Sequence, residues 1–243
     1  MVEDDRADFD NLVWDISDEA WVKSQKRLRY TPTCLLAASL AEQKFGQHAE
    51  FVSPLHISGF NVLYKINLED TSLDVMVRLP CPELSQFPHE KVTVEAATMK
   101  YVAQNTYIPI PQIYHHGFDS ELGPFIILQH IKNDLSLSHE LRLPNEDLDA
   151  TYVLDTNTSK DVLMKYDVKI AGYLLQLSKL NFPRIGSLLE VEGNGDDTPY
   201  YATKGRPMSM NMNNMIQLAN IPGAVLPPPR IKLMRPPTSG MLP

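Results

Sequence analysis

The sequence predicts an α+β protein in which an antiparallel sheet packs against one main helix. Apolar and polar residues alternate over residues 57–68 and 73–79, which is the period-two pattern of two strands joined as a hairpin. Residues 90–104 carry apolar side chains at helical spacing instead. Two further strand patterns follow over residues 112–118 and 125–131. A helix between two pairs of strands predicts this mixed fold class.

The composition excludes several classes of protein. Of the 243 residues, 43% are apolar and 21% charged, which is typical of a globular chain. The net charge of −8, with one short basic run at residues 23–29, argues against nucleic acid or an anionic membrane as the main partner. The start, Met-Val-Glu-Asp-Asp, is unlike a signal peptide, and no apolar run reaches the roughly 20 residues of a membrane span. Cys34 and Cys81 lack metal-ligand or redox spacing, so we expect a reduced intracellular, cytoplasmic location.

The first 50 residues are predicted to form a helical, partly irregular extension. Asp15 and Asp18 can cap a turn that carries Trp21, and a helix is expected over residues 34–45. Gly46 would end that helix, because glycine readily adopts the left-handed conformation of a helix C-terminus.

A glycine-containing segment, Ser58-Gly59-Phe60-Asn61, lies at the head of the first hairpin. Without a Cβ, Gly59 lets backbone N–H groups approach a phosphate closely. The alternative, which is favoured when the residue is read alone, is a glycine needed only for a turn or bulge.

The predicted helix at residues 90–104 combines an apolar face with a carboxylate at its border. Its apolar positions, expected to be buried, are Val92, Ala96, Met99 and Ala103. Glu95 borders that face, and an unpaired buried carboxylate costs several kcal/mol. Arg78 on the neighbouring strand is therefore the expected partner of Glu95. The alternative is that Glu95 reaches water beside Lys91.

The second half of the chain predicts a polar region, a long helix and a proline-rich tail. After loops at residues 132–158, Thr158 and Asp161 form a capping-box-like start to an amphipathic helix that ends near Lys179. Its apolar stripe predicts the core of a second, helical region, and it consists of Leu163, Tyr166, Ile170, Tyr173, Leu174 and Leu177. A short strand is expected within residues 182–189, a turn at 193–197 and a helix at 211–220. Prolines from residue 223 onward predict an extended tail.

Several segments in this order resemble the aminoglycoside-phosphotransferase-like branch of the protein-kinase-like fold, especially its large fungal group. The pieces are Ser58-Gly59-Phe60-Asn61-Val62-Leu63-Tyr64-Lys65-Ile66, Val77-Arg78-Leu79-Pro80, Val94-Glu95-Ala96-Ala97-Thr98-Met99-Lys100-Tyr101-Val102, Ile108-Pro109-Ile110-Pro111-Gln112-Ile113-Tyr114 and Gly123-Pro124-Phe125-Ile126-Ile127-Leu128. Phe182 to Leu188 and Gly205-Arg206-Pro207 fit the next part of that family. The resemblance covers roughly residues 50–222, and its specificity comes from order and spacing.

The resemblance implies a kinase-like small lobe that binds ATP. It places Ser58, Gly59 and Asn61 in the loop above the nucleotide phosphates. It makes Arg78 the basic residue that contacts phosphates, where kinases usually have lysine, and Glu95 the carboxylate that orients it. The hinge whose backbone pairs with adenine would be Gln129, His130 and Ile131.

The expected machinery for phosphoryl transfer is not found in the sequence. The family has a His-Gly-Asp loop, an Asn five residues after its Asp, and a later metal-binding Asp. Here the nearest pair, Gly195-Asp196, follows Asn194, and Tyr201 stands where the Asn would be. We therefore expect no catalytic residue and no magnesium ligands, in a chain that stops before the catalytic loop.

Four regions are expected on this interpretation: an extension (1–50), an N-lobe (51–131), the start of a helical C-lobe (132–222) and the tail (223–243). Three functional interpretations stay open. The chain is a phosphotransferase by descent, a non-catalytic nucleotide-binding or regulatory fragment, or a truncated product without its own function. On the last interpretation, self-association would occur through an uncovered face of the 158–179 helix.

Overall fold

The computed structural model describes residues 5–58, 61–71, 73–81, 87–132, 137–143, 153–191 and 200–207. In chain order these residues form α1 (Asp5–Leu28), α2 (Thr31–Phe45), β1 (Ala49–Ser58), β2 (Asn61–Leu68), β3 (Leu73–Pro80), α3 (Pro88–Asn105), β4 (Ile113–Gly117), β5 (Phe125–Gln129), α4 (Leu137–Glu140), α5 (Lys160–Ser178), β6 (Ser187–Val191) and β7 (Tyr200–Gly205).

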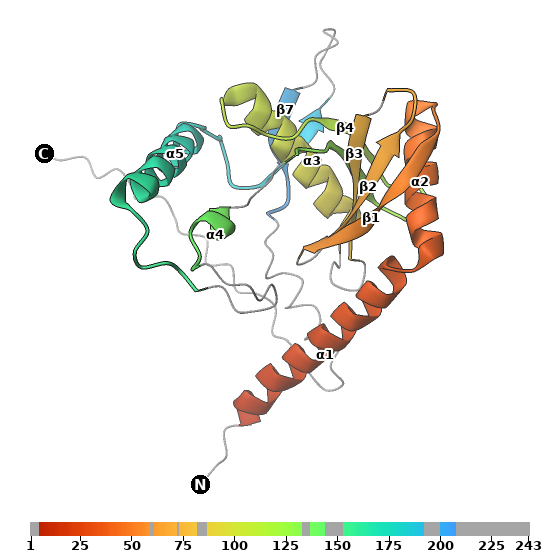
Figure 1. The fold of residues 1–243 in the computed structure, drawn as a ribbon, viewed down its shortest axis with the longest axis horizontal. Helices are drawn as coiled ribbons and strands as arrows, with labels where there is room; N and C mark the ends of the chain where they lie inside the picture. Colours follow the sequence, from red (N-terminus) through yellow and green to blue (C-terminus); the bar gives the residue numbers. More distant parts are fainter. Residues whose placement is uncertain are drawn as a thin grey trace, which may run out of the picture.

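A five-stranded antiparallel sheet, in the order β1-β2-β3-β5-β4, lies between α2 and α3 (Figure 1). A separate two-stranded hairpin is formed by β6 and β7. The chain enters α3 after β3 and returns to the sheet through β4 and β5. The helix between two groups of antiparallel strands confirms the predicted α+β class.

The alternation in β2 and β3 sends side chains to two different helical layers. Val62, Tyr64 and Ile66 are fully buried in the core shared with α1 and α2. On the opposite face, Met76 of β3 and Ile126 of β5 pack in a second core that includes residues of α3. The α3 face of the sheet is therefore the one that carries Asn61, Lys65, Asp74 and Arg78.

The strand predicted at residues 57–68 is wrong as a single element. The structure has two strands there, and Ser58 at the end of β1 pairs with Asn61 at the start of β2. The alternation of apolar and polar residues continues from the end of β1 into β2. The periodicity of the sequence therefore did not reveal where one strand ends and the next begins. Within α3, Val92 and Ala96 are buried as predicted, Met99 is half-buried, and Ala103 is exposed because it lies beyond the edge of the sheet contact.

The N-terminal extension is more regular than the sequence predicted. Instead of a capped turn, α1 is one helix of 24 residues that leads away from the sheet in Figure 1. Its C-terminal part packs on the core through Trp21, and the Tyr64 hydroxyl donates to the Leu28 carbonyl at 2.6 Å. α2 begins at Thr31 and ends at Phe45, and Gly46 caps it with a φ of 67°, as expected for a helix C-terminus.

The prediction for α5 was wrong in its cap and in its burial. The N-cap is Ser159, one residue after Thr158, and its hydroxyl accepts from the Val162 N–H at 3.3 Å. No residue of α5 is buried, and Leu174 is 61% exposed. The amphipathic spacing predicted the helix correctly, but none of the described elements covers its apolar stripe.

The short strand predicted within residues 182–189 is confirmed in part by β6. The turn at 193–197, the helix at 211–220 and the tail lie outside the described residues. Among those that are described, no helix has the length and apolar character to cross a membrane.

Candidate functional site

The predicted partnership between Arg78 and Glu95 is confirmed. Arg78 points from β3 toward α3, and its Nη1 donates to the Glu95 Oε1 in a close ion pair. The two side chains remain 21% and 25% exposed, so the pair is neither sealed in the core nor fully solvated. A carboxylate that pairs with a guanidinium fixes the orientation of its planar fork.

Lys91 and Asn61 lie at the same end of the sheet. Lys91, one helical turn before Glu95, donates to the Asn61 Oδ1 at 3.3 Å. Burial lowers the pKa of Lys91, the Glu95 carboxylate opposes that shift, and the Arg78 charge adds to it. The two cations Arg78 and Lys91 thus both interact with the Glu95 carboxylate, near the start of β2. We call Asn61, Arg78, Lys91 and Glu95 the cation cluster.

Sequence reasoning missed Lys91 as a site residue. It considered Lys91 only as a solvated neighbour of Glu95, whereas the structure places it half-buried against Asn61. The available signal was the spacing of four residues between Lys91 and Glu95, which puts both on one helix face. Of the other loop residues, Ser58 pairs with Asn61 in the sheet, and Gly59 lies outside the described residues.

A second polar group lies at the other end of the same sheet face. The Asp74 carboxylate accepts from Asn67 Nδ2 at 2.9 Å and pairs with Lys65 Nζ at 3.0 Å. These contacts, the Asn67 hydrogen bond first, lower the pKa of Asp74. His130 follows β5, and its buried Nδ1 lies 3.7 Å from the Asp74 Oδ2 without a hydrogen-bond partner among the described residues.

The three predicted hinge residues occupy different environments. The Gln129 N–H donates to the Gln112 carbonyl at 2.8 Å, so it is already engaged. His130 faces Asp74 and Lys65, and Ile131 is 51% exposed. A base that pairs with a backbone N–H of this segment would therefore use His130 or Ile131.

The β6–β7 hairpin packs against α3 on the side away from the sheet. Following β7, Arg206 pairs with Glu90 through two hydrogen bonds of 2.7 and 2.8 Å and lies over the Phe87 ring, 3.9 Å from its centroid. At the other end of α3, Lys100 donates to Glu190 of β6 at 2.9 Å. The helix that carries Lys91 and Glu95 is thus held at both ends.

The histidines and carboxylates do not form a metal centre in the part of the chain that the structure describes. There, no group of three or more His, Cys, Asp or Glu side chains could hold a metal ion. His115 and His116 point to different neighbours, as predicted for adjacent strand residues. His115 contacts the Phe45 ring, and His116 lies 3.2 Å from Lys100 Nζ.

Comparison with known proteins gives little further information. No protein-family model matches this chain, and no curated protein sequence matches it. Among solved structures, the chain is similar to the GDP and kanamycin complex of APH(2")-IIia, at 18% sequence identity and a TM-score of 0.39. That match covers 59% of this chain and 41% of the other. Because the TM-score is below 0.5, no property of that protein is carried over to this chain.

Proposed function

We propose that this chain is a kinase-like protein that binds the phosphates of ATP at the cation cluster. The observation that carries the proposal is the Arg78–Glu95 ion pair with Lys91 beside it. A guanidinium oriented by a carboxylate is well suited to phosphate oxygens, since its planar fork can donate two parallel hydrogen bonds. The second cation raises the local positive potential in a chain whose net charge is −8.

The sheet register supports a position for the rest of the nucleotide. Arg78 pairs with Ile126, and Val75 pairs with Gln129, so the hinge segment lies three residues along β3 from Arg78. At the rise of a strand, this separation is about 10 Å. We propose that the phosphates lie at Arg78 and that the base lies toward His130 and Ile131.

We further propose that binding in this chain occurs without phosphoryl transfer. The family activity implied by the sequence resemblance is ATP-dependent transfer to a small-molecule hydroxyl. That reaction needs an Asp to orient the acceptor and two further metal ligands. The sequence lacks the His-Gly-Asp pattern that would supply the first of them.

A calorimetric titration of the full chain with ATP, with and without magnesium, tests the proposal. We expect saturable binding by ATP and much weaker binding by adenosine, which lacks phosphates. Arg78→Gln should weaken ATP binding about 10- to 100-fold, because a hydrogen bond to a charged group contributes about 1.5–3 kcal/mol.

Lys44→Gln is the matched control. Lys44 is 24% exposed and pairs with Asp119, but it lies on α2, on the other side of the sheet. This variant should bind ATP as the parent does. No heat with ATP at millimolar concentration, or equal losses for Arg78→Gln and Lys44→Gln, would refute nucleotide binding. ATP turnover above a buffer control would refute only the absence of transfer.

A further inference from the structure

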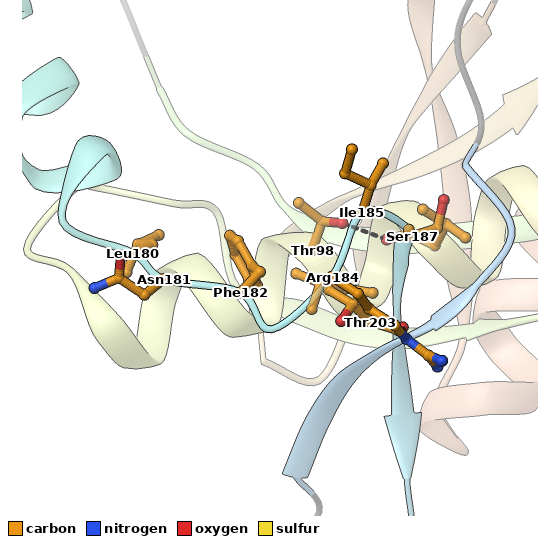
Figure 2. Close-up of a pocket in the computed structure, with 11 residues that line it drawn as sticks. Thr98, Leu180, Asn181, Phe182, Arg184, Ile185, Ser187 and Thr203 are labelled. Carbon is orange, nitrogen blue, oxygen red and sulfur yellow. Dashed lines mark hydrogen bonds between the residues drawn. The ribbon is translucent and has the colours of Figure 1, made fainter. Parts of the chain in front are cut away.

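A cavity of about 670 Å³ lies between α3 and the β6–β7 hairpin, and the nucleotide proposal does not use it (Figure 2). This volume is in the usual range of small-molecule sites. Val94 and Thr98 of α3 line the cavity, whereas Val92 and Ala96 of the same helix pack in the core between α3 and the sheet. It is therefore separate from the cation cluster, although both lie on one helix.

The hydroxyl groups of two largely buried residues line this cavity. Ser187 is 8% exposed and Thr203 is 6% exposed, and neither hydroxyl forms a hydrogen bond with another described residue. Thr98 differs, because its hydroxyl donates to the Val94 carbonyl at 2.7 Å within α3. Neither the Ser187 nor the Thr203 hydroxyl oxygen is buried and unsatisfied, since His130 Nδ1 is the atom of that kind in the described part of the chain. The two hydroxyls therefore remain open to the cavity, where they can pair with polar atoms of a ligand.

The charge of the lining favours an anion. Among the described residues that line it, Arg184 is the one with a charge, and none carries a carboxylate. The Arg184 Nε donates to the Thr203 carbonyl, which fixes the guanidinium at the hairpin and leaves its terminal N–H groups for a ligand. Figure 2 shows Arg184 and Thr203 side by side, with Phe182 on the segment that leads into them.

The hairpin is closely packed, which gives the cavity a defined wall. A Cβ at Gly186 would lie 2.7 Å from the Gly205 carbonyl oxygen and 3.3 Å from that of Thr203. Only glycine allows the two strands to approach in this way. The apolar part of the wall consists of Val94, Leu180, Phe182, Ile185 and Leu188.

We propose that this cavity binds a small molecule with an apolar body and one carboxylate group. Arg184 binds the carboxylate, the hydroxyls of Ser187 and Thr203 pair with polar atoms beside it, and the apolar wall contacts the body. The proposal does not depend on nucleotide binding, because none of these residues belongs to the cation cluster.

Phenylpropionate is a suitable probe, with phenylpropanamide as its neutral analogue, in a titration of the full chain followed by ligand-observed NMR. We expect the carboxylate to bind and the amide to bind at least about tenfold more weakly, as expected when a charge-assisted contact is lost. Arg184→Gln should weaken the carboxylate about 10- to 100-fold and leave the amide unchanged. Arg29→Gln, which removes a cation elsewhere, is the control and should have no effect.

Two further variants separate a binding site from a structural gap. Thr98→Phe fills the mouth of the cavity from an exposed helix position and should abolish binding with the fold intact by circular dichroism. Ser187→Ala should weaken binding while the urea midpoint stays close to that of the parent, because no side-chain hydrogen bond to another described residue is lost. Equal affinities for phenylpropionate and its amide, or parent-like binding by both Arg184→Gln and Thr98→Phe, would overturn the proposal.

Discussion

Replacing Arg78 and Glu95 by glutamine, singly and together, gives the sharpest test of the cation cluster. The two side chains are 21% and 25% exposed. Breaking a fully buried ion pair costs about 3–5 kcal/mol, and an exposed pair contributes about 0.2–1 kcal/mol. At this intermediate exposure we expect each single substitution to lower the free energy of unfolding by about 1–3 kcal/mol.

Lys91 makes the two single substitutions unequal. Glu95 raises the pKa of Lys91 and Arg78 lowers it, so both charges act on the ammonium group. Glu95→Gln removes the carboxylate that pairs with Arg78 and raises the pKa of Lys91, whereas Arg78→Gln keeps that carboxylate beside Lys91. Glu95→Gln should therefore destabilise the fold more than Arg78→Gln, and the double variant should cost less than the sum of the two.

The effects on ATP binding should have the opposite order. Arg78→Gln removes a phosphate donor, while Glu95→Gln keeps both cations and loses only the orientation of one. Unfolding in urea should be followed by circular dichroism, which reports on the helices and the sheet together. The prediction is contradicted if the variant that lowers the free energy of unfolding more also binds ATP more weakly.

Two other predictions follow from burial. The lowered pKa of Lys91 means that the folded chain releases this proton below the ordinary value of 10.5, while the unfolded chain keeps it. Between the lowered pKa of Lys91 and 10.5, ATP affinity should fall as pH rises, and the free energy of unfolding should rise. Lys91→Met should remove both pH dependences. A difference between parent and variant that does not change with pH would contradict this prediction. Leu174, which is 61% exposed on α5, can be changed to Glu with an effect within about 0.5 kcal/mol, whereas Leu79→Ala, at 1% exposed, should cost about 2–5 kcal/mol. Urea midpoints measure both, and a comparable loss for the two leucine variants would place the core elsewhere.

The parts of the fold that were predictable are those in which burial fixes the pattern. Val62, Tyr64 and Ile66 alternate because one face of β2 is fully enclosed, and a shift of one residue would expose all of them. Glu95 was assigned a partner for the same reason, since a carboxylate at an apolar border needs one. The sequence pattern did not show that β1 ends at Ser58 and β2 begins at Asn61. Apolar and polar residues alternate in the same way in both strands, whichever direction the chain runs.

The features that the sequence did not predict depend on contacts between residues far apart in the chain. The stripe on α5 has the spacing of a buried helix face, but spacing does not specify what packs against it, and Leu174 is exposed. The contact between Glu90 and Arg206 joins residues 116 positions apart, and no local signal predicts such a pairing. The cavity beneath the β6–β7 hairpin depends on the same long-range packing.

The two proposed sites share α3, and this has a structural consequence. The helix meets the sheet through few buried residues, namely Val92, Ala96 and Ala97. Its position along and around its own axis is therefore also determined by the contacts of Glu90 with Arg206 and of Lys100 with Glu190. Lys91 and Glu95 lie between those two contacts, so the geometry of the cation cluster depends on the hairpin as well as on the sheet. Residues 61–95 carry the proposed phosphate-binding groups, and the contacts of Glu190 and Arg206 help to hold α3 in position beside them.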